Sequence, residues 1–297
     1  MGARAAGAAR GLLLALAFWA GAPAGAAQEL PTPWETPPGN PLEHSTAGFA
    51  KVLCSAVFIT GRDPAVAADE DGFFVSSREE RRQVVKTVVD REREAVHLTL
   101  ANGVTRSARH FPDQGCITLP RGKDSVNFTP VRVVSSLPDP ENLPWPMGDV
   151  LPEAPLPAEL NAAKLREATA AAFDPPEALT AAFVVVYRGR IVAERYQAGL
   201  DHRTRLPGWS MGKSITATLM GRLVYQGAYD LWAAAPVAEW QKPGDPRRAI
   251  RIADLLRMSS GLRFVSQLDP DFDSAAGYPD HLYVYTGAVD AFRWSIT

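Results

Sequence analysis

Prolines divide this chain before any helix or strand is assigned to it. Seven prolines fall within residues 138–157, and five more fall within residues 27–43. Because proline lacks an amide N–H and fixes φ, neither stretch can form a continuous helix or a central strand. We therefore expect a Pro-rich leader at 27–43 and a Pro-rich connector at 136–158. They separate a first folded region, 44–135, from a second one, 159–297.

The first 26 residues are typical of a secretory signal. Arg4 and Arg10 form a basic segment before a short apolar run, and Ala24 and Ala26 have the small side chains of a cleavage site. The apolar run is shorter than the about 20 residues that a membrane-spanning helix needs. We expect residues 1–26 to be a signal peptide cleaved near Ala26, and the mature chain to be periplasmic or secreted with no membrane contact. An uncleaved N-terminal anchor is the alternative.

If the chain is exported as expected, its two cysteines, Cys54 and Cys116, lie in an oxidising environment. Cysteines of exported proteins tend to pair, and we expect these two to form a disulfide. A bridge that closes this loop would stabilise the fold by roughly 4 kcal/mol on the chain-entropy model. Two free thiols packed as small apolar side chains are the alternative.

The net charge and the missing motifs argue against nucleic-acid, metal and cofactor partners. The chain has 31 basic and 33 acidic residues, a net charge of −2, so it lacks the basic excess of a nucleic-acid-binding protein. Neither cysteine has metal-ligand or redox spacing, and no phosphate-binding loop is present. We therefore expect no nucleic-acid partner, no metal and no cofactor.

The first folded region is predicted to be a small α+β unit. Ser77 and Glu80 form a capping box, which predicts a charged helix from Ser77 to about Arg93. Two alternating segments, 95–100 and 104–109, flank Asn-Gly and predict a β-hairpin. His97 and His110 lie in this hairpin, where a histidine is more often structural than catalytic.

The second folded region is predicted to contain two helices and a hairpin. Residues 159–173 form an Ala-rich helix, and residues 182–187 and 190–196 pair as strands. The first strand is almost wholly apolar, which predicts that both of its faces are covered. A further helix is predicted from Ser210 to Gln226, and its many apolar side chains predict burial in the middle of the domain.

Ser210 and Lys213 begin this last helix and carry the predicted chemistry. Residues three apart lie on one helix face, one turn from each other. Burial and the positive end of the helix dipole would both lower the pKa of Lys213. A neutral lysine could accept the hydroxyl proton of Ser210, which makes Ser-x-x-Lys a nucleophile and base pair without histidine. The backbone N–H of Ser210 could also stabilise an oxyanion.

The sequence Trp-Ser-Met-Gly-Lys-Ser at 209–214, after a hairpin and before the segment 252–262, resembles the serine β-lactamase-related hydrolases. This is the class C β-lactamase-like group, which includes esterases and 6-aminohexanoate-dimer hydrolases, and the Ser-Met-Gly-Lys variant is most similar to the amide-hydrolase and esterase branch. The resemblance covers roughly 160–297. It implies a β-lactamase/transpeptidase-like α+β fold with an antiparallel sheet flanked by helices. It also implies a small ester, amide or lactam substrate, with Ser210 acylated and Lys213 as its base.

Two further motifs of that family are absent from this sequence. A Tyr-x-Asn should follow the serine, but the last asparagine of the chain is Asn161. The tripeptides 242–244 and 285–287 mimic the family's Lys-Thr-Gly, but both follow Ser210 too closely and are expected in loops. We therefore expect a C-terminally incomplete hydrolase domain, preceded by the α+β region 44–135 as an extension.

Two alternatives remain open from the sequence. Residues 208–212 also match G-x-S-x-G, the nucleophile elbow of α/β-hydrolases, which requires a buried strand directly before the serine and a later acid and histidine. Residues 201–207 are not strand-like, and His281 is the only histidine after Ser210. The other alternative is a catalytically inert fragment or binding module on the same scaffold. In that case Ser210 is only a helix cap and Lys213 is solvated.

Overall fold

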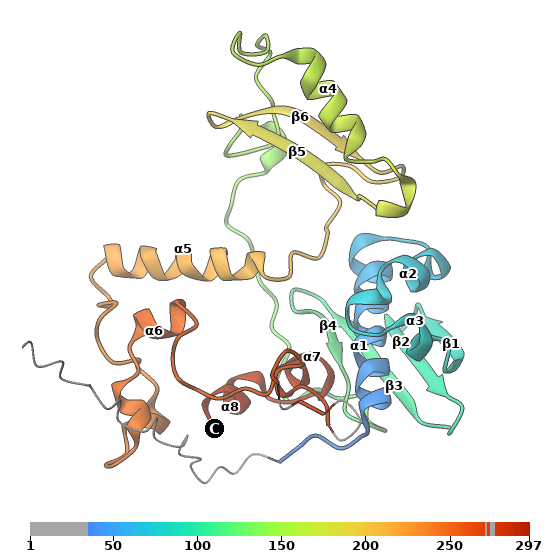
Figure 1. Cartoon of the computed structure of the whole chain (residues 1–297), viewed down its shortest axis with the longest axis vertical. Helices are drawn as coiled ribbons and strands as arrows, with labels where there is room; N and C mark the ends of the chain where they lie inside the picture. The colour runs from blue at the N-terminus through green and yellow to red at the C-terminus, as the bar shows by residue number, and fades with distance from the viewer. Residues whose placement is uncertain (1–34, 271, 274–276) are drawn as a thin grey trace, which may run out of the picture. The chain divides into compact units, whose positions relative to one another are not determined.

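A computed structural model describes residues 35–270, 272–273 and 277–297 (Figure 1). The predicted signal peptide, 1–26, lies outside the described residues. The first helix, α1 (Pro41–Ser55), begins inside the predicted Pro-rich leader, which therefore ends at Asn40 rather than at residue 43. Proline is well tolerated in a first helical turn, where its missing N–H has no helical partner. The side chain of Asn40 caps the helix by accepting the N–H of Glu43 at 2.9 Å.

The first folded region is built on a four-stranded antiparallel sheet in the order β1-β2-β3-β4, in which β1 comprises Val84–Asp90. The predicted hairpin is confirmed as β2 (Ala95–Leu100) and β3 (Thr105–Phe111), with Val96 opposite Ala108. Its turn contains Gly103 at φ +83°, a left-handed conformation that glycine adopts without steric cost. The fourth strand, β4 (Gly115–Thr118), pairs with β3.

Helix α1 packs against β2, β3 and β4 and forms the main core of this region with them (Figure 1). The alternation of the strands places one set of side chains toward α1, as the period of two requires. The predicted disulfide is confirmed: Cys54 of α1 is bonded to Cys116 of β4, and both side chains are buried. The largest buried apolar side chains of this core are Phe49, Leu53, Val96 and Leu98.

The predicted helix from Ser77 to Arg93 is wrong in its second half. The capping box forms as expected, but helix α3 (Arg78–Arg81) is only one turn long. The chain then enters strand β1 (Val84–Asp90), which pairs with β2. The four valines of β1 have the spacing of an apolar helix face, which is why a helix was predicted. Valine is also β-branched, and β-branched residues favour strands because their side chains pack well on a pleated surface. Pairing with β2 across the turn at residues 91–94 decided between the two.

The second folded region contains the predicted helix and hairpin. Helix α4 (Ala162–Ala171) lies within the expected range, and β5 (Ala182–Tyr187) pairs with β6 (Arg190–Tyr196) as expected. The expectation that both faces of β5 are covered is wrong. Val184 and Val186 are 45% and 52% exposed, because among the described residues the sheet has only these two strands.

The remaining structure is mostly short. The Pro-rich connector carries a 3₁₀ turn and one isolated bridge, between Pro144 and Val150. Across the described ranges, no helix combines the length and apolar character needed to cross a membrane. The other α-helices are α2 (Pro64–Glu70), α5 (Met211–Tyr225), α6 (Ile252–Leu256), α7 (Tyr283–Thr286) and α8 (Ala291–Ile296).

Candidate active site at the N-terminus of helix α5

The turn that leads into α5 holds the predicted nucleophile in a strained backbone. Trp209 has φ +42°, which is uncommon for a residue with a large side chain. Backbone hydrogen bonds fix this turn: the N–H of Met211 donates to the carbonyl of Gly208 at 2.9 Å, and that of Gly212 donates to Trp209 at 3.1 Å. Backbone strain of this kind is often found at functional sites, where the surrounding structure maintains it.

Ser210 and Lys213 are brought together as the spacing predicts. The ammonium of Lys213 donates a hydrogen bond to the hydroxyl oxygen of Ser210 over 2.8 Å. Ser210 is the N-cap residue of α5, but its side chain caps no backbone N–H. The hydroxyl is therefore directed to Lys213 instead of serving as an ordinary helix cap.

The predicted burial of α5 is wrong. Met211, Ile215 and Leu219 are 67%, 64% and 62% exposed, and Ser210 and Lys213 are exposed as well. No other helix or strand within the described ranges packs extensively against α5. The sequence showed that one side of this helix is apolar, but not whether another element covers it. The apolar surroundings that were expected around Lys213 are therefore missing.

Tyr285 contacts the residue that precedes the nucleophile. Its ring lies edge-on to the indole of Trp209, with the ring centroids 6.0 Å apart. Such edge-to-face pairs contribute about 0.5–1.5 kcal/mol beyond their buried area. From the sequence, Tyr285 begins a Lys-Thr-Gly mimic that is expected in a loop, and it is also one of four aromatic residues that could line a cleft. The structure places it in helix α7.

The first folded region holds α7 in place through two hydrogen bonds. Arg106 of β3 donates to the carbonyl of Thr286 at 3.0 Å, and the hydroxyl of Thr118 donates to the carbonyl of Tyr285 at 2.6 Å. Arg106 is 2% exposed, and burial lowers the pKa of its guanidinium. No local pattern indicates these contacts, because more than 160 residues separate the partners in each pair.

The described residues directly before Ser210 lack the strand that the α/β-hydrolase alternative requires. An elbow requires a strand that ends at the nucleophile, but residues 197–209 form turns and irregular backbone. The single later histidine, His281, lies in a 3₁₀ turn, Asp280–Leu282. No group of three or more potential metal ligands occurs among the described residues.

Comparison with known families gives one match. Residues 169–291 match the family model described as Beta-lactamase, and this segment includes Ser210 and Lys213. The match supports a relationship of this part of the chain to the serine hydrolases of that family and is consistent with an α+β fold. No curated protein and no solved structure matches the chain.

Proposed function

We propose that this chain is an exported serine hydrolase that cleaves an ester, amide or lactam bond through an acyl-enzyme on Ser210. The observation that carries the proposal is the 2.8 Å contact between the Lys213 amine and the Ser210 hydroxyl at the start of α5. The match to the Beta-lactamase family over 169–291 supports the reaction class. The substrate is most simply that of the amide-hydrolase and esterase branch, which the Ser-Met-Gly-Lys sequence resembles.

In the proposed reaction, the neutral form of Lys213 accepts the proton of the Ser210 hydroxyl. The serine oxygen forms a bond to the substrate carbonyl carbon, and the carbonyl oxygen becomes an oxyanion near the N-terminus of α5, where backbone N–H groups and the helix dipole stabilise it. The bond to the leaving group breaks, and the proton held by Lys213 passes to that group. Water then hydrolyses the acyl-serine and restores both residues.

Labelling with a fluorescent fluorophosphonate, followed by mass spectrometry of the labelled peptide, tests this proposal. We expect label on Ser210, loss of label in Ser210→Ala, and retention of label in His281→Ala. Loss of label in His281→Ala would instead favour the α/β-hydrolase alternative. A folded wild-type chain that takes up no label would favour an inert module.

Export is a separate part of the proposal, supported by the signal-like pattern of residues 1–26 and by the disulfide between Cys54 and Cys116. Expression with this segment in a bacterial host, followed by N-terminal sequencing of the periplasmic protein, should give Ala27 as the first residue. Retention of Met1 or of the initial arginines in that fraction would contradict cleavage.

A further inference from the structure

A cavity of about 340 Å³ lies between the first folded region and the α7–α8 segment, and Tyr285, whose ring contacts Trp209, is one of its lining residues. Its volume falls in the range of small-molecule sites. Its walls are largely apolar and come from β4, from the loop after β4 and from the last two helices. The lining residues that matter here are Lys51, Ile117, Phe128, Val284, Val289 and Phe292.

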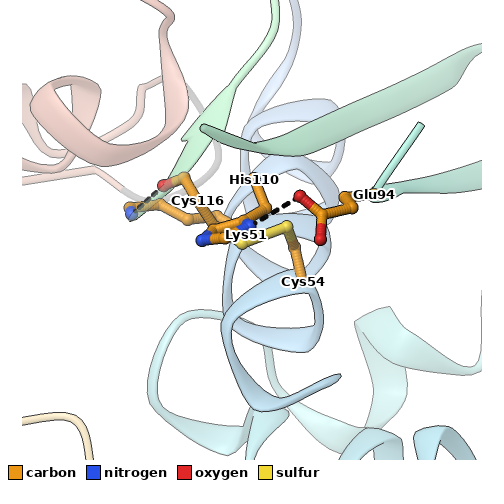
Figure 2. Close-up of a disulfide and its surroundings, with 5 residues drawn as sticks. All are labelled: Lys51, Cys54, Glu94, His110 and Cys116. Atoms are coloured by element: carbon orange, nitrogen blue, oxygen red, sulfur yellow. Dashed lines mark hydrogen bonds and ion pairs between the residues drawn. A yellow bond between two sulfur atoms is a disulfide. The ribbon is translucent and has the colours of Figure 1, made fainter. Parts of the chain in front are cut away.

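Lys51, from helix α1, is the one basic residue among those that line this cavity. Its ammonium donates one hydrogen bond, to the carbonyl of Cys116 at 2.6 Å, and it forms no ion pair with any described carboxylate. Figure 2 shows the ammonium pointing away from Glu94, whose carboxylate instead pairs with His110 at 2.9 Å. Two N–H groups of Lys51 therefore remain for a ligand.

The charge of Lys51 is poorly compensated. Burial lowers the pKa of its amine, because the charged form loses hydration at this position. A charged group is seldom buried without a partner, because its desolvation is costly. An anion bound in the cavity would supply the missing countercharge.

The position of Lys51 and of the cavity wall is fixed by covalent and hydrogen bonds. The disulfide joins α1 to β4 three residues after Lys51, and the carbonyl that Lys51 contacts belongs to the bonded cysteine itself (Figure 2). The hydroxyl of Thr118 donates to the carbonyl of Tyr285, which ties the opposite wall to β4. A site held in this way binds without a large ordering cost.

One acid, Asp290, also lines the cavity, and its charge is already engaged. Its carboxylate accepts the N–H of Arg293 at 3.1 Å and lies 3.8 Å from the guanidinium of the same residue. Asp290 is exposed, as are Phe128 and Phe292, which are 40% and 64% exposed, so the cavity is partly open to solvent.

We propose that this cavity binds a small organic carboxylate, with the carboxylate on Lys51 and an apolar body between Phe128 and Phe292. A single ammonium matches one negative charge, whereas a phosphate carries more charge and would need several donors. The apolar walls favour an alkyl or aryl body over a free inorganic anion. The cavity does not include Ser210 or Lys213, although its lining residue Tyr285 contacts Trp209, the neighbour of Ser210.

Isothermal titration of the full chain with three probes of one shape tests the proposal: 4-phenylbutyrate, 4-phenylbutanol and 4-phenylbutylamine. We expect the acid to bind at least about tenfold more tightly than the alcohol, and the amine to bind most weakly. Lys51→Met, which keeps the apolar stem, should remove the preference for the acid and leave the affinity for the alcohol unchanged. Lys123→Met, an exposed lysine of the neighbouring loop, is the matched control and should bind like wild type.

A second variant protects the test against misfolding of Lys51→Met. Val126 lines the cavity, and Val126→Trp should fill it and abolish binding of both the acid and the alcohol while circular dichroism stays unchanged. The proposal is overturned if wild type binds none of the probes, if it binds acid and alcohol equally, or if the folded Lys51→Met variant keeps the preference for the acid.

Discussion

The amine of Lys213 lies 2.8 Å from the hydroxyl oxygen of Ser210, and both side chains are exposed at the start of α5. Helix geometry explains the contact, because the two residues are one turn apart on the same face. The sequence predicts both a close contact between the two side chains and apolar surroundings for Lys213. The structure contains the contact but not the apolar surroundings.

Replacing Lys213 by arginine should abolish acylation of Ser210. Arginine keeps the positive charge but does not give up its proton in proteins, so it cannot act as a base. We expect the rate of fluorophosphonate labelling to fall by about 10²- to 10⁴-fold, the usual contribution of a positioned base. Lys164→Arg on α4 is the control. A labelling rate that Lys213→Arg leaves intact would show that Lys213 is not the base.

The exposed apolar residues of α5 should contribute little to stability. Leu219 is 62% exposed, so Leu219→Gln should change the free energy of unfolding by no more than about 0.5 kcal/mol. Leu98 of β2 is fully buried, and Leu98→Ala should cost about 2–5 kcal/mol. Urea denaturation measures both. A large loss in Leu219→Gln would mean that α5 is covered in solution.

The disulfide should make a large contribution to the first folded region. Its bonded cysteines are 62 residues apart, so Cys54→Ala combined with Cys116→Ala should lower the free energy of unfolding by about 4 kcal/mol. Non-reducing peptide mapping of the wild type should recover the linked pair. Two thiols that react with an alkylating agent in the unreduced, denatured chain would contradict the bond.

His44 should make stability fall as the medium becomes acidic. Burial, and secondarily the charge of Arg106, lower the pKa of this fully buried imidazole. The unfolded chain therefore binds a proton near pH 6.5 that the folded chain does not yet bind, and stability is lost as the pH falls below that value.

The effect of His44 can be isolated by substitution. In urea denaturation from pH 8 to pH 5, His44→Gln should show a shallower loss than wild type, by up to about 1.4 kcal/mol per pH unit. His202→Gln, at an exposed position, should follow the wild-type curve. Parallel curves for wild type and His44→Gln would exclude this histidine as the source.

Arg106 should be needed to hold α7. Arg106→Met removes the hydrogen bond to the Thr286 carbonyl and one of two cations near buried Glu43, whose carboxylate Arg121 still approaches at 3.4 Å, at a cost of about 1.5–3 kcal/mol. Hydrogen exchange should quicken at residues 283–287 more than in β2. Arg106→Lys keeps the charge but not the planar donor fork. Its rate of hydrogen exchange at residues 283–287 should lie between the rates of wild type and Arg106→Met. Unchanged exchange at α7 would show that other contacts hold it.

Local patterns in the sequence predicted the elements that depend on neighbouring residues. The capping box at Ser77, the hairpin turn at Gly103 and the hairpin of β5 and β6 all form, because their hydrogen bonds join residues close in sequence. The contact of Ser210 with Lys213 belongs to the same class. The pairing of Cys54 with Cys116 could also be predicted, since with only two cysteines in the chain each has one possible partner.

Tertiary structure alone decided the features that depend on distant partners. The apolar side of α5 predicts a buried helix, but burial requires another element to cover it, and the described structure supplies none. The approach of Tyr285 to Trp209 and the hold of Arg106 on Thr286 join residues far apart in the chain, which no local pattern encodes. A sequence determines which surfaces are apolar and which side chains can react, whereas their burial and their partners are set only when the chain packs.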